Sequence, residues 1–134
     1  MPERSIWRET LIQPVSVLVI EDEEFLREII LNILHTKGFR AIGTGDARRG
    51  LLLAKEWIPD LILCDIRMPE IDGYQVLRSL RQDALTANIP LIFLTAETLQ
   101  EVVSQGQQLG ANGYLTKPFT TQELLEAIAS HLKK

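Results

Sequence analysis

The sequence predicts an α/β fold in which five strands form one parallel sheet covered by helices on both faces. Short runs rich in Val, Ile and Leu alternate along the chain with longer segments whose apolar residues recur at helical spacing, which indicates repeated βα units. Three of these runs are apolar without alternation, as strands buried on both faces are: 17–20, 61–64 and 91–94. Short connections and right-handed crossovers then favour an open, doubly wound (βα)5 sheet.

The expected elements alternate from residue 15 to the end of the chain. After the first strand, one apolar helix face is expected from Phe25, Leu26, Ile29, Ile30, Ile33 and Leu34, with Gly38 as the stop. The last helix has Thr120 or Thr121 as its N-cap, with Glu123 close behind. The expected strands are 15–20, 39–44, 60–65, 90–95 and 113–116, and the other helices are 47–57, 73–82, 98–109 and 121–132.

Length and charge limit the classes of protein that fit. A chain of 134 residues, 46% of them hydrophobic, suits one globular domain with a single core. We assign this domain to 15–134 and treat 1–14, which has weak periodicity and ends at Pro14, as an N-terminal extension. The net charge of -4 and the lack of a Lys/Arg-rich run argue against direct binding to nucleic acid.

Cysteine usage and hydropathy predict a cytoplasmic protein. The single cysteine, Cys64, cannot form an internal disulfide and lies in an apolar run, so a buried core thiol is expected. The N-terminus has no apolar signal core, and no uncharged apolar stretch approaches the ~18 to 20 residues of a membrane span. We therefore expect no membrane insertion.

Polar residues stand where the apolar strands end. Glu21 and Asp22 follow the first strand, Asp65 ends the third, Thr95 ends the fourth, and Lys117 follows the last. Each has an ordinary explanation alone, because acidic residues cap helices, Asp forms turns and lysine is common on surfaces. The carboxyl ends of parallel strands meet at one edge of the sheet, however, where ligands bind in such folds. Their combination therefore predicts a site.

The chemistry of that site follows from its charges. Three carboxylates in one crevice, from Glu21, Asp22 and Asp65, repel one another unless a cation lies among them. A hard, oxygen-preferring divalent ion, Mg²⁺ or Mn²⁺, suits such ligands. Asp65 is then placed as a nucleophile toward a phosphoryl group, with the ion and the Lys117 ammonium neutralising charge and the Thr95 hydroxyl binding an oxygen.

Four motifs resemble the receiver domain of response regulators in two-component signalling. They are Val17-Leu-Val-Ile-Glu-Asp-Glu23, Leu63-Cys-Asp-Ile-Arg-Met-Pro-Glu-Ile-Asp-Gly73, Leu94-Thr-Ala96 and Gly110-Ala-Asn-Gly-Tyr-Leu-Thr-Lys-Pro-Phe119. The likeness extends over 15–132. It implies the flavodoxin-like strand order 2-1-3-4-5 and, because the chain stops after its fifth helix, a stand-alone receiver similar to chemotaxis regulators.

The resemblance implies how the phosphoryl group is received. Asp65 would accept it from a sensor histidine kinase or a phosphotransfer protein. The Mg²⁺ would be arranged by Glu21, Asp22, Asp65 and the backbone carbonyl of Arg67. Glu21 departs from the family pattern, in which an aspartate is commoner, and its longer side chain is expected to shift the metal or to bind it through water.

The resemblance also implies a switch and its surroundings. Thr95 and Lys117 would contact the phosphate, and Tyr114 would move inward when Thr95 is drawn to the phosphoryl group. The peptide bond between Lys117 and Pro118 would be cis. Ala96 is small, as access to the site requires. Arg67 and Glu97, two positions beyond Asp65 and Thr95, are expected either to pair across the mouth of the site and modulate access or to remain two solvated charges.

The expected output is contact with a downstream protein through the fourth helix, fifth strand and fifth helix. The family's DNA-binding members often dimerise there through basic and acidic residues. In this chain 121–130 contains no arginine, and Asn112 stands where an aspartate is expected. We therefore expect a monomer or a weak dimer of another kind.

Two alternatives compete with the receiver. A Mg²⁺-dependent phosphatase or phosphotransferase also uses an aspartate nucleophile, but it usually has a second Asp two residues later, where this chain has Arg67. A receiver-shaped module that has lost phosphorylation would not need Asp22, Asp65, Thr95 and Lys117 together. We therefore expect a signalling phosphoacceptor that catalyses only its own phosphoryl transfer and dephosphorylation. His35 and His131 lack evident partners and are expected at the surface.

Overall fold

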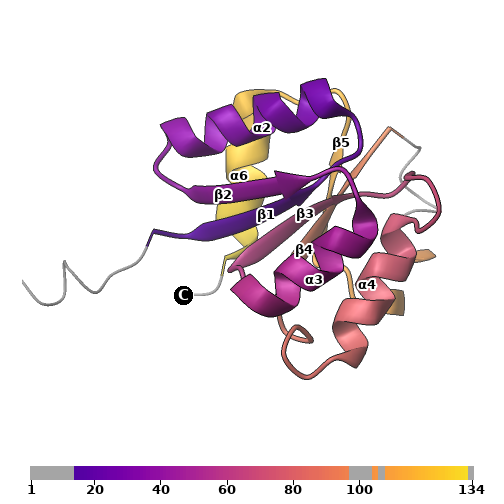
Figure 1. Ribbon diagram of the computed structural model, residues 1–134. Helices are drawn as coiled ribbons and strands as arrows, with labels where there is room; N and C mark the ends of the chain where they lie inside the picture. Colours follow the sequence, from indigo (N-terminus) through magenta and orange to yellow (C-terminus); the bar gives the residue numbers. More distant parts are fainter. Residues whose placement is uncertain (1–13, 97–103, 106–107, 133–134) are drawn as a thin grey trace, which may run out of the picture.

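The computed structural model describes residues 14–96, 104–105 and 108–132. Its strands are β1 (Ser16–Ile20), β2 (Arg40–Thr44), β3 (Leu61–Asp65), β4 (Leu91–Thr95) and β5 (Gly113–Thr116), and its helices are α2 (Glu24–Thr36), α3 (Ala47–Trp57), α4 (Gly73–Gln82) and α6 (Thr121–His131). The strands pair in parallel in the order β2-β1-β3-β4-β5, which confirms the predicted order (Figure 1). Most of the helix expected at 98–109 lies outside the described residues.

The sheet is the middle of three layers, with α2 and α6 on one face and α3 and α4 on the other (Figure 1). Alternate residues of β1 serve the two faces, since Val17 and Val19 pack with α2 and α6, while Leu18 and Ile20 pack with α3 and α4. All residues of β3 and β4 are buried. The expectation of central strands buried on both faces is thereby confirmed.

Local capping explains where two helices begin. The Asp72 side chain accepts a hydrogen bond from the Gln75 backbone N–H, and the Gln75 side chain accepts one from the Asp72 N–H, so that a capping box starts α4. Thr120 and Glu123 form the same arrangement at the start of α6. The N-cap of the last helix is therefore Thr120.

The apolar face of α2 is wider than the surface it covers. Ile30 and Leu34 are fully buried, as expected. Phe25 and Ile29 are 75% and 39% exposed, so only part of the predicted apolar face is buried.

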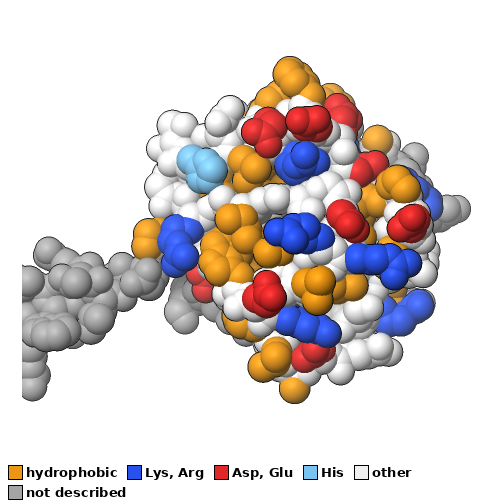
Figure 2. Space-filling view, viewed as in Figure 1, with side chains coloured by type: hydrophobic (Ala, Val, Ile, Leu, Met, Phe, Trp, Pro, Cys, Tyr) orange, Lys and Arg blue, Asp and Glu red, His pale blue; other side chains and the backbone are white. Residues whose placement is uncertain are grey.

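Charges of both signs are mixed on the face in Figure 2, where Lys and Arg side chains alternate with Asp and Glu over α2, α3 and α4. This face has no continuous basic stripe of the kind that tracks a nucleic acid backbone. Among the described residues, no helix combines the length and the apolar character that crossing a membrane requires.

Candidate functional site

The polar residues that end the strands meet at one edge of the sheet. Register places the ends of neighbouring strands side by side, with Asp65 opposite Leu94 and Thr95 opposite Thr116. Glu21 is fully buried, Asp65 is 6% exposed and Thr95 is 2% exposed. Charged and hydroxyl side chains are thus held inside the protein at the edge where the sequence predicts a site.

Three carboxylates form a compact cluster. Glu21, Asp22 and Asp65 each offer an oxygen within 4.8 Å of the others. Asp22 is exposed, whereas the other two carboxylates are buried, so the cluster opens to solvent on the Asp22 side. Its arrangement suits a divalent cation that keeps some of its water ligands.

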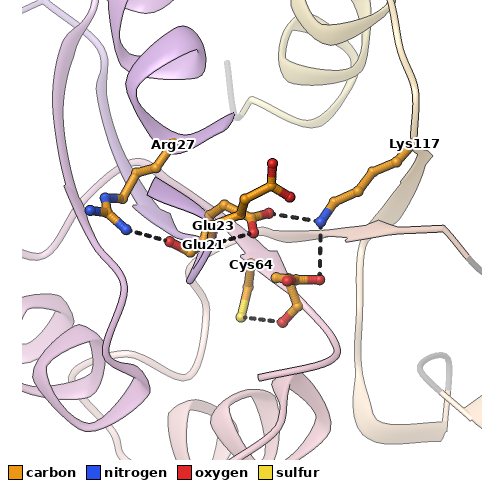
Figure 3. Close-up of polar contacts among 6 residues, drawn as sticks. Glu21, Glu23, Arg27, Cys64 and Lys117 are labelled. Atoms are coloured by element: carbon orange, nitrogen blue, oxygen red, sulfur yellow. Dashed lines mark hydrogen bonds and ion pairs between the residues drawn. The ribbon is translucent and has the colours of Figure 1, made fainter. Parts of the chain in front are cut away.

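Lys117 brings the positive charge of the cluster (Figure 3). Its Nζ lies 2.9 Å from Oε1 of Glu21 and 3.4 Å from Oδ1 of Asp65, and its side chain is 20% exposed. Oε1 of Glu21 makes this ion pair but no well-directed hydrogen bond to any described residue. One ammonium therefore faces two buried carboxylates, and a buried acceptor oxygen is left incompletely satisfied.

The electrostatics of the cluster favour an added cation. Burial, and then the negative charge of Glu21, raise the pKa of Asp65 to about 7 against the opposing effect of Lys117. Burial lowers the pKa of Lys117, but the Glu21 and Asp65 carboxylates outweigh it and the net shift is upward. Keeping Asp65 ionised thus costs free energy that one lysine only partly offsets.

Arg27 holds the acidic strand end in place, a role that sequence reasoning missed. Its Nη1 donates a hydrogen bond to the Glu21 carbonyl over 2.8 Å (Figure 3), and the Glu23 backbone N–H donates one to Oε2 of Glu21. A Cβ at Gly45 would lie 2.7 Å from Arg27 Nη1, so a larger residue there would have to displace the guanidinium. The only signal in the sequence is an arginine six residues after the first acidic one.

The end of β3 is fixed by the start of α4. The Gly73 N–H donates to the Ile66 carbonyl over 2.8 Å. A Cβ at Gly73 would lie 2.8 Å from the Ile66 Cα and would clash with the Asp65 carbonyl oxygen.

The Cys64 thiol donates a hydrogen bond to the Asp65 carbonyl oxygen (Figure 3). Burial, followed by the negative charge of Asp65, raises the pKa of this thiol well above its usual value. Cys64 is the buried core thiol that was predicted.

Lys117 and Tyr114 are positioned by β5. The Lys117 N–H donates to the Thr95 carbonyl over 2.7 Å, and the peptide bond to Pro118 is cis. Tyr114 is partly buried, with its ring centroid 5.9 Å from that of Phe93, which lies 5.4 Å from the ring of Tyr74. Rings from α4, β4 and β5 thus contact one another in succession on the face of the sheet that α3 and α4 cover.

The residues expected around the site are only partly described. Arg67 and Ala96 are exposed next to the strand ends. Glu97 lies outside the described residues, so its expected pairing with Arg67 stays a prediction. His35 is exposed, and its Nε2 donates to the Ala41 carbonyl; His131 is partly buried against the end of α6, where its Nδ1 donates to the Ala127 carbonyl.

Comparison with known proteins decides the family. A model of the response regulator receiver domain matches residues 17–129. The chain belongs to the response regulator receiver family. Domains of this family accept phosphoryl groups in two-component signalling, bind Mg²⁺ in an acidic pocket, and interact with histidine kinases or phosphotransfer proteins and with downstream targets.

Relatives of this receiver include longer regulators and one of similar length, polar-differentiation response regulator DivK of Brucella anthropi, which is 34% identical over 119 residues, 89% of this chain and 97% of that protein. Response regulator Rre1 of Synechocystis sp. is 37% identical over 123 residues, which are 91% of this chain and 53% of that protein. The receiver spans about half the length of Rre1 and of several other curated relatives.

Solved structures share the receiver fold. Vibrio cholerae chemotaxis protein CheY4 is 28% identical with a TM-score of 0.86, and the match covers 90% of this chain and 100% of that one. The receiver domain of sensor histidine kinase PA1611 from Pseudomonas aeruginosa is 31% identical with a TM-score of 0.81, and the match covers 89% of this chain and 98% of that one. The PA1611 structure has a magnesium ion coordinated in its active-site cleft.

Proposed function

We propose that this receiver takes a phosphoryl group onto Asp65 from the phosphohistidine of a sensor kinase or phosphotransfer protein. A carboxylate oxygen of Asp65 forms the new O–P bond while the P–N bond to the imidazole breaks, and the imidazole leaves. The observation that carries the proposal is a buried carboxylate at the end of β3 within 3.4 Å of the Lys117 ammonium. We propose that Lys117 and the Thr95 hydroxyl bind phosphoryl oxygens.

The described residues fit a divalent cation. Oε1 of Glu21 is buried without a hydrogen bond from any described residue, three carboxylates converge, and the pKa of Asp65 is raised by burial and by Glu21. We propose Glu21, Asp22, Asp65 and the Arg67 carbonyl as the residues that arrange Mg²⁺ or Mn²⁺. When bound, such an ion neutralises charge on the carboxylates and on the phosphoryl oxygens. Glu21 and Asp22 would both supply carboxylate charge to the ion, Asp22 from the solvent-exposed side of the cluster.

Signal output then depends on two states of the domain. Phosphorylation favours the state in which Thr95 binds the phosphoryl group and Tyr114 turns inward, and it can do so only through a difference in interaction free energy between the two states. The surface of β5, α6 and residues 98–109 is proposed to bind a downstream protein in the cytoplasm. The free thiol of Cys64 suits that reducing compartment.

The contacts of Asn112 support the proposal that the domain does not dimerise through the surface of β5, α6 and residues 98–109. Its side-chain oxygen accepts hydrogen bonds from Arg81 Nη2 and the Leu91 N–H, both over 2.9 Å. The position that would carry an aspartate for a partner is therefore engaged within the domain. We propose a monomer or a weak dimer, and light scattering with beryllofluoride tests it, because a tight dimer formed only with this phosphoryl mimic would contradict it.

A phosphatase is a weaker candidate. Arg67, which stands where a general acid/base aspartate would be, is exposed beside the site. We propose that the domain catalyses only its own phosphorylation and dephosphorylation. Sustained hydrolysis of p-nitrophenyl phosphate by the wild-type chain, at a rate that Asp65→Asn abolishes, would favour the enzyme instead.

Acetyl phosphate labelling tests the phosphoacceptor directly. With Mg²⁺ present, mass spectrometry of the intact chain is expected to find one added phosphoryl group, and fragment mapping is expected to place it on Asp65. With EDTA the label should be absent. Labelling that is independent of the metal, or that maps to a histidine, would contradict the proposal.

A further inference from the structure

A groove lies at the amino ends of the strands, opposite the acidic site, and about half of its exposed lining is apolar. Its volume is about 490 Å³, within the ~300 to 1,000 Å³ range of pockets that enclose small ligands. Its walls come from the start of β1, the α3–β3 turn, the segment between α4 and β4, and the end of α6. The apolar residues of its lining include Val15, Ile58, Pro59, Leu85, Ile89 and Leu132.

Two side chains of this groove expose apolar surface. Leu85 is 63% exposed and Ile58 is 45% exposed. Ile58 has a φ of 47°, in the left-handed region, where a β-branched residue is strained and where glycine usually ends a helix. An isoleucine is thus held at a backbone cost at the rim of the groove. Strained residues of this kind cluster at functional and ligand-contacting sites, so the strain at Ile58 supports contact with something that covers the rim.

The charged residue of the lining has its hydrogen bonds within the domain. Oδ2 of Asp60 accepts from the Ser16 N–H over 2.9 Å and from the Ser16 hydroxyl over 3.1 Å. The Asp60 N–H in turn donates to the Ser16 hydroxyl. The surface that gains most from being covered is therefore the apolar part of the groove.

We propose that this groove binds the chain's own N-terminal segment, residues 1–13, with Trp7, Leu11 and Ile12 against its apolar walls. The segment leads into Val15, which is itself part of the lining. At ~3.6 Å per residue, Ile12 lies within roughly 11 Å of Val15 and Trp7 within roughly 29 Å. The start of β1 and the end of α6 lie at this same end of the sheet (Figure 1).

The short tether favours this occupant over a second molecule. A segment joined to its own binding site has an effective concentration in the millimolar range. A separate chain at micromolar concentration competes poorly for the same apolar surface. The groove is then a docking surface within the chain, on the side of the domain that the phosphorylation site does not use.

Tryptophan fluorescence of the full chain tests the proposal. The chain has two tryptophans, Trp7 and Trp57, so Trp57→Phe leaves Trp7 as the only one. In that background the emission of Trp7 is expected at shorter wavelength, and with less quenching by acrylamide, than in a free peptide of residues 1–14. The protection should not change when the protein is diluted.

Matched substitutions show whether the groove provides the protection. Leu85→Ser should shift Trp7 emission toward that of the free peptide. Leu52→Ser, at a leucine that is 59% exposed on α3 and outside the lining, should leave the emission unchanged. Ile58→Gly should also expose Trp7 while urea midpoints stay the same or rise, because glycine relieves the left-handed strain.

Three results would overturn the proposal. The first is Trp7 emission equal to that of the free peptide in the starting background. The second is an equal response to Leu85→Ser and Leu52→Ser. The third is protection that disappears on dilution, which would mean that a second copy of the chain fills the groove.

Discussion

The strand β3 is bracketed by two aspartates with opposite surroundings. Asp65, at its carboxyl end, is buried beside the Glu21 carboxylate and the Lys117 ammonium. Asp60, just before its amino end, is exposed and hydrogen-bonded by Ser16. The residue type is the same, so the neighbours decide the chemistry. At the carboxyl edge of the sheet, burial and a neighbouring carboxylate disfavour the ionised form of Asp65. At the amino edge, Asp60 is an exposed carboxylate whose Oδ2 accepts hydrogen bonds from Ser16.

The largest expected difference between the two aspartates is in phosphorylation. Asp65→Asn should lower uptake from acetyl phosphate on the order of a thousandfold or more, because the nucleophile is lost. Asp60→Asn should take up the label at the wild-type rate. Mass spectrometry of intact protein over time measures both. Uptake at the wild-type rate by both variants would show that neither carboxylate is the acceptor.

The second-largest difference between the two edges is expected in the Mg²⁺ affinity. Asp22→Ala removes a carboxylate from the cluster and should weaken Mg²⁺ binding by roughly 10- to 100-fold without unfolding the domain. Asp60→Ala, at the other edge, should leave the affinity unchanged. Isothermal titration calorimetry gives both affinities, and an unaltered value for Asp22→Ala would remove it from the ligand set.

Lysine substitutions compare a buried ion pair with an exposed one. Lys117→Ala leaves Glu21 and Asp65 without their counter-charge and should lower the free energy of unfolding by about 2 kcal/mol in EDTA, with part of it restored by Mg²⁺. Lys55→Ala breaks a pair with Asp83 in which the lysine side chain is 48% exposed, and should cost below ~1 kcal/mol. Urea denaturation measures the free energy of unfolding of both variants. A similar loss of stability in the two would mean that Lys117 pairs as weakly as a surface lysine.

A change of pH is expected to alter the free energy of unfolding by a smaller amount. The folded-state pKa of Asp65 is raised from 3.8 to about 7, so between these values the folded state binds a proton that the unfolded state does not. Stability in EDTA should therefore rise by about 1 kcal/mol between pH 8 and pH 6.

Two controls isolate Asp65 in that titration. The rise should be absent in Asp65→Asn, whose side chain does not ionise, and it should be suppressed by Mg²⁺, which holds the carboxylate ionised. Asp60→Asn should show the same rise in stability as the wild-type chain. Thermal unfolding at matched ionic strength measures all of them, and a rise that persists in Asp65→Asn would assign it to other groups.

The smallest effect is expected from Ser16 at the amino edge. Ser16→Ala removes one hydroxyl that donates to an exposed carboxylate and should lower stability by about 0.5 kcal/mol. The loss should be the same with and without Mg²⁺. A metal-dependent loss, seen in paired urea curves, would mean that the two edges are coupled through the sheet.

Much of the architecture follows from the sequence because parallel strands constrain one another. Strand limits were predicted to within one residue, and α3 and α4 were predicted as 47–57 and 73–82. Since crossovers are right-handed and strands run in parallel, polar residues that end separate strands converge at one edge. Glu21, Asp22, Asp65 and Lys117 therefore meet, as the sequence alone indicated.

Burial was decided only by the tertiary structure. Glu21 and Asp22 are adjacent in the chain, yet one is buried and the other exposed, and Phe25 lies outside the core despite its place in an apolar helical pattern. The same holds for Arg27, whose guanidinium holds the acidic strand end and lies against Gly45 from another part of the chain. Periodicity reports which residues share a face. Which part of that face is covered depends on neighbours from distant parts of the chain, and a local pattern carries no information about them.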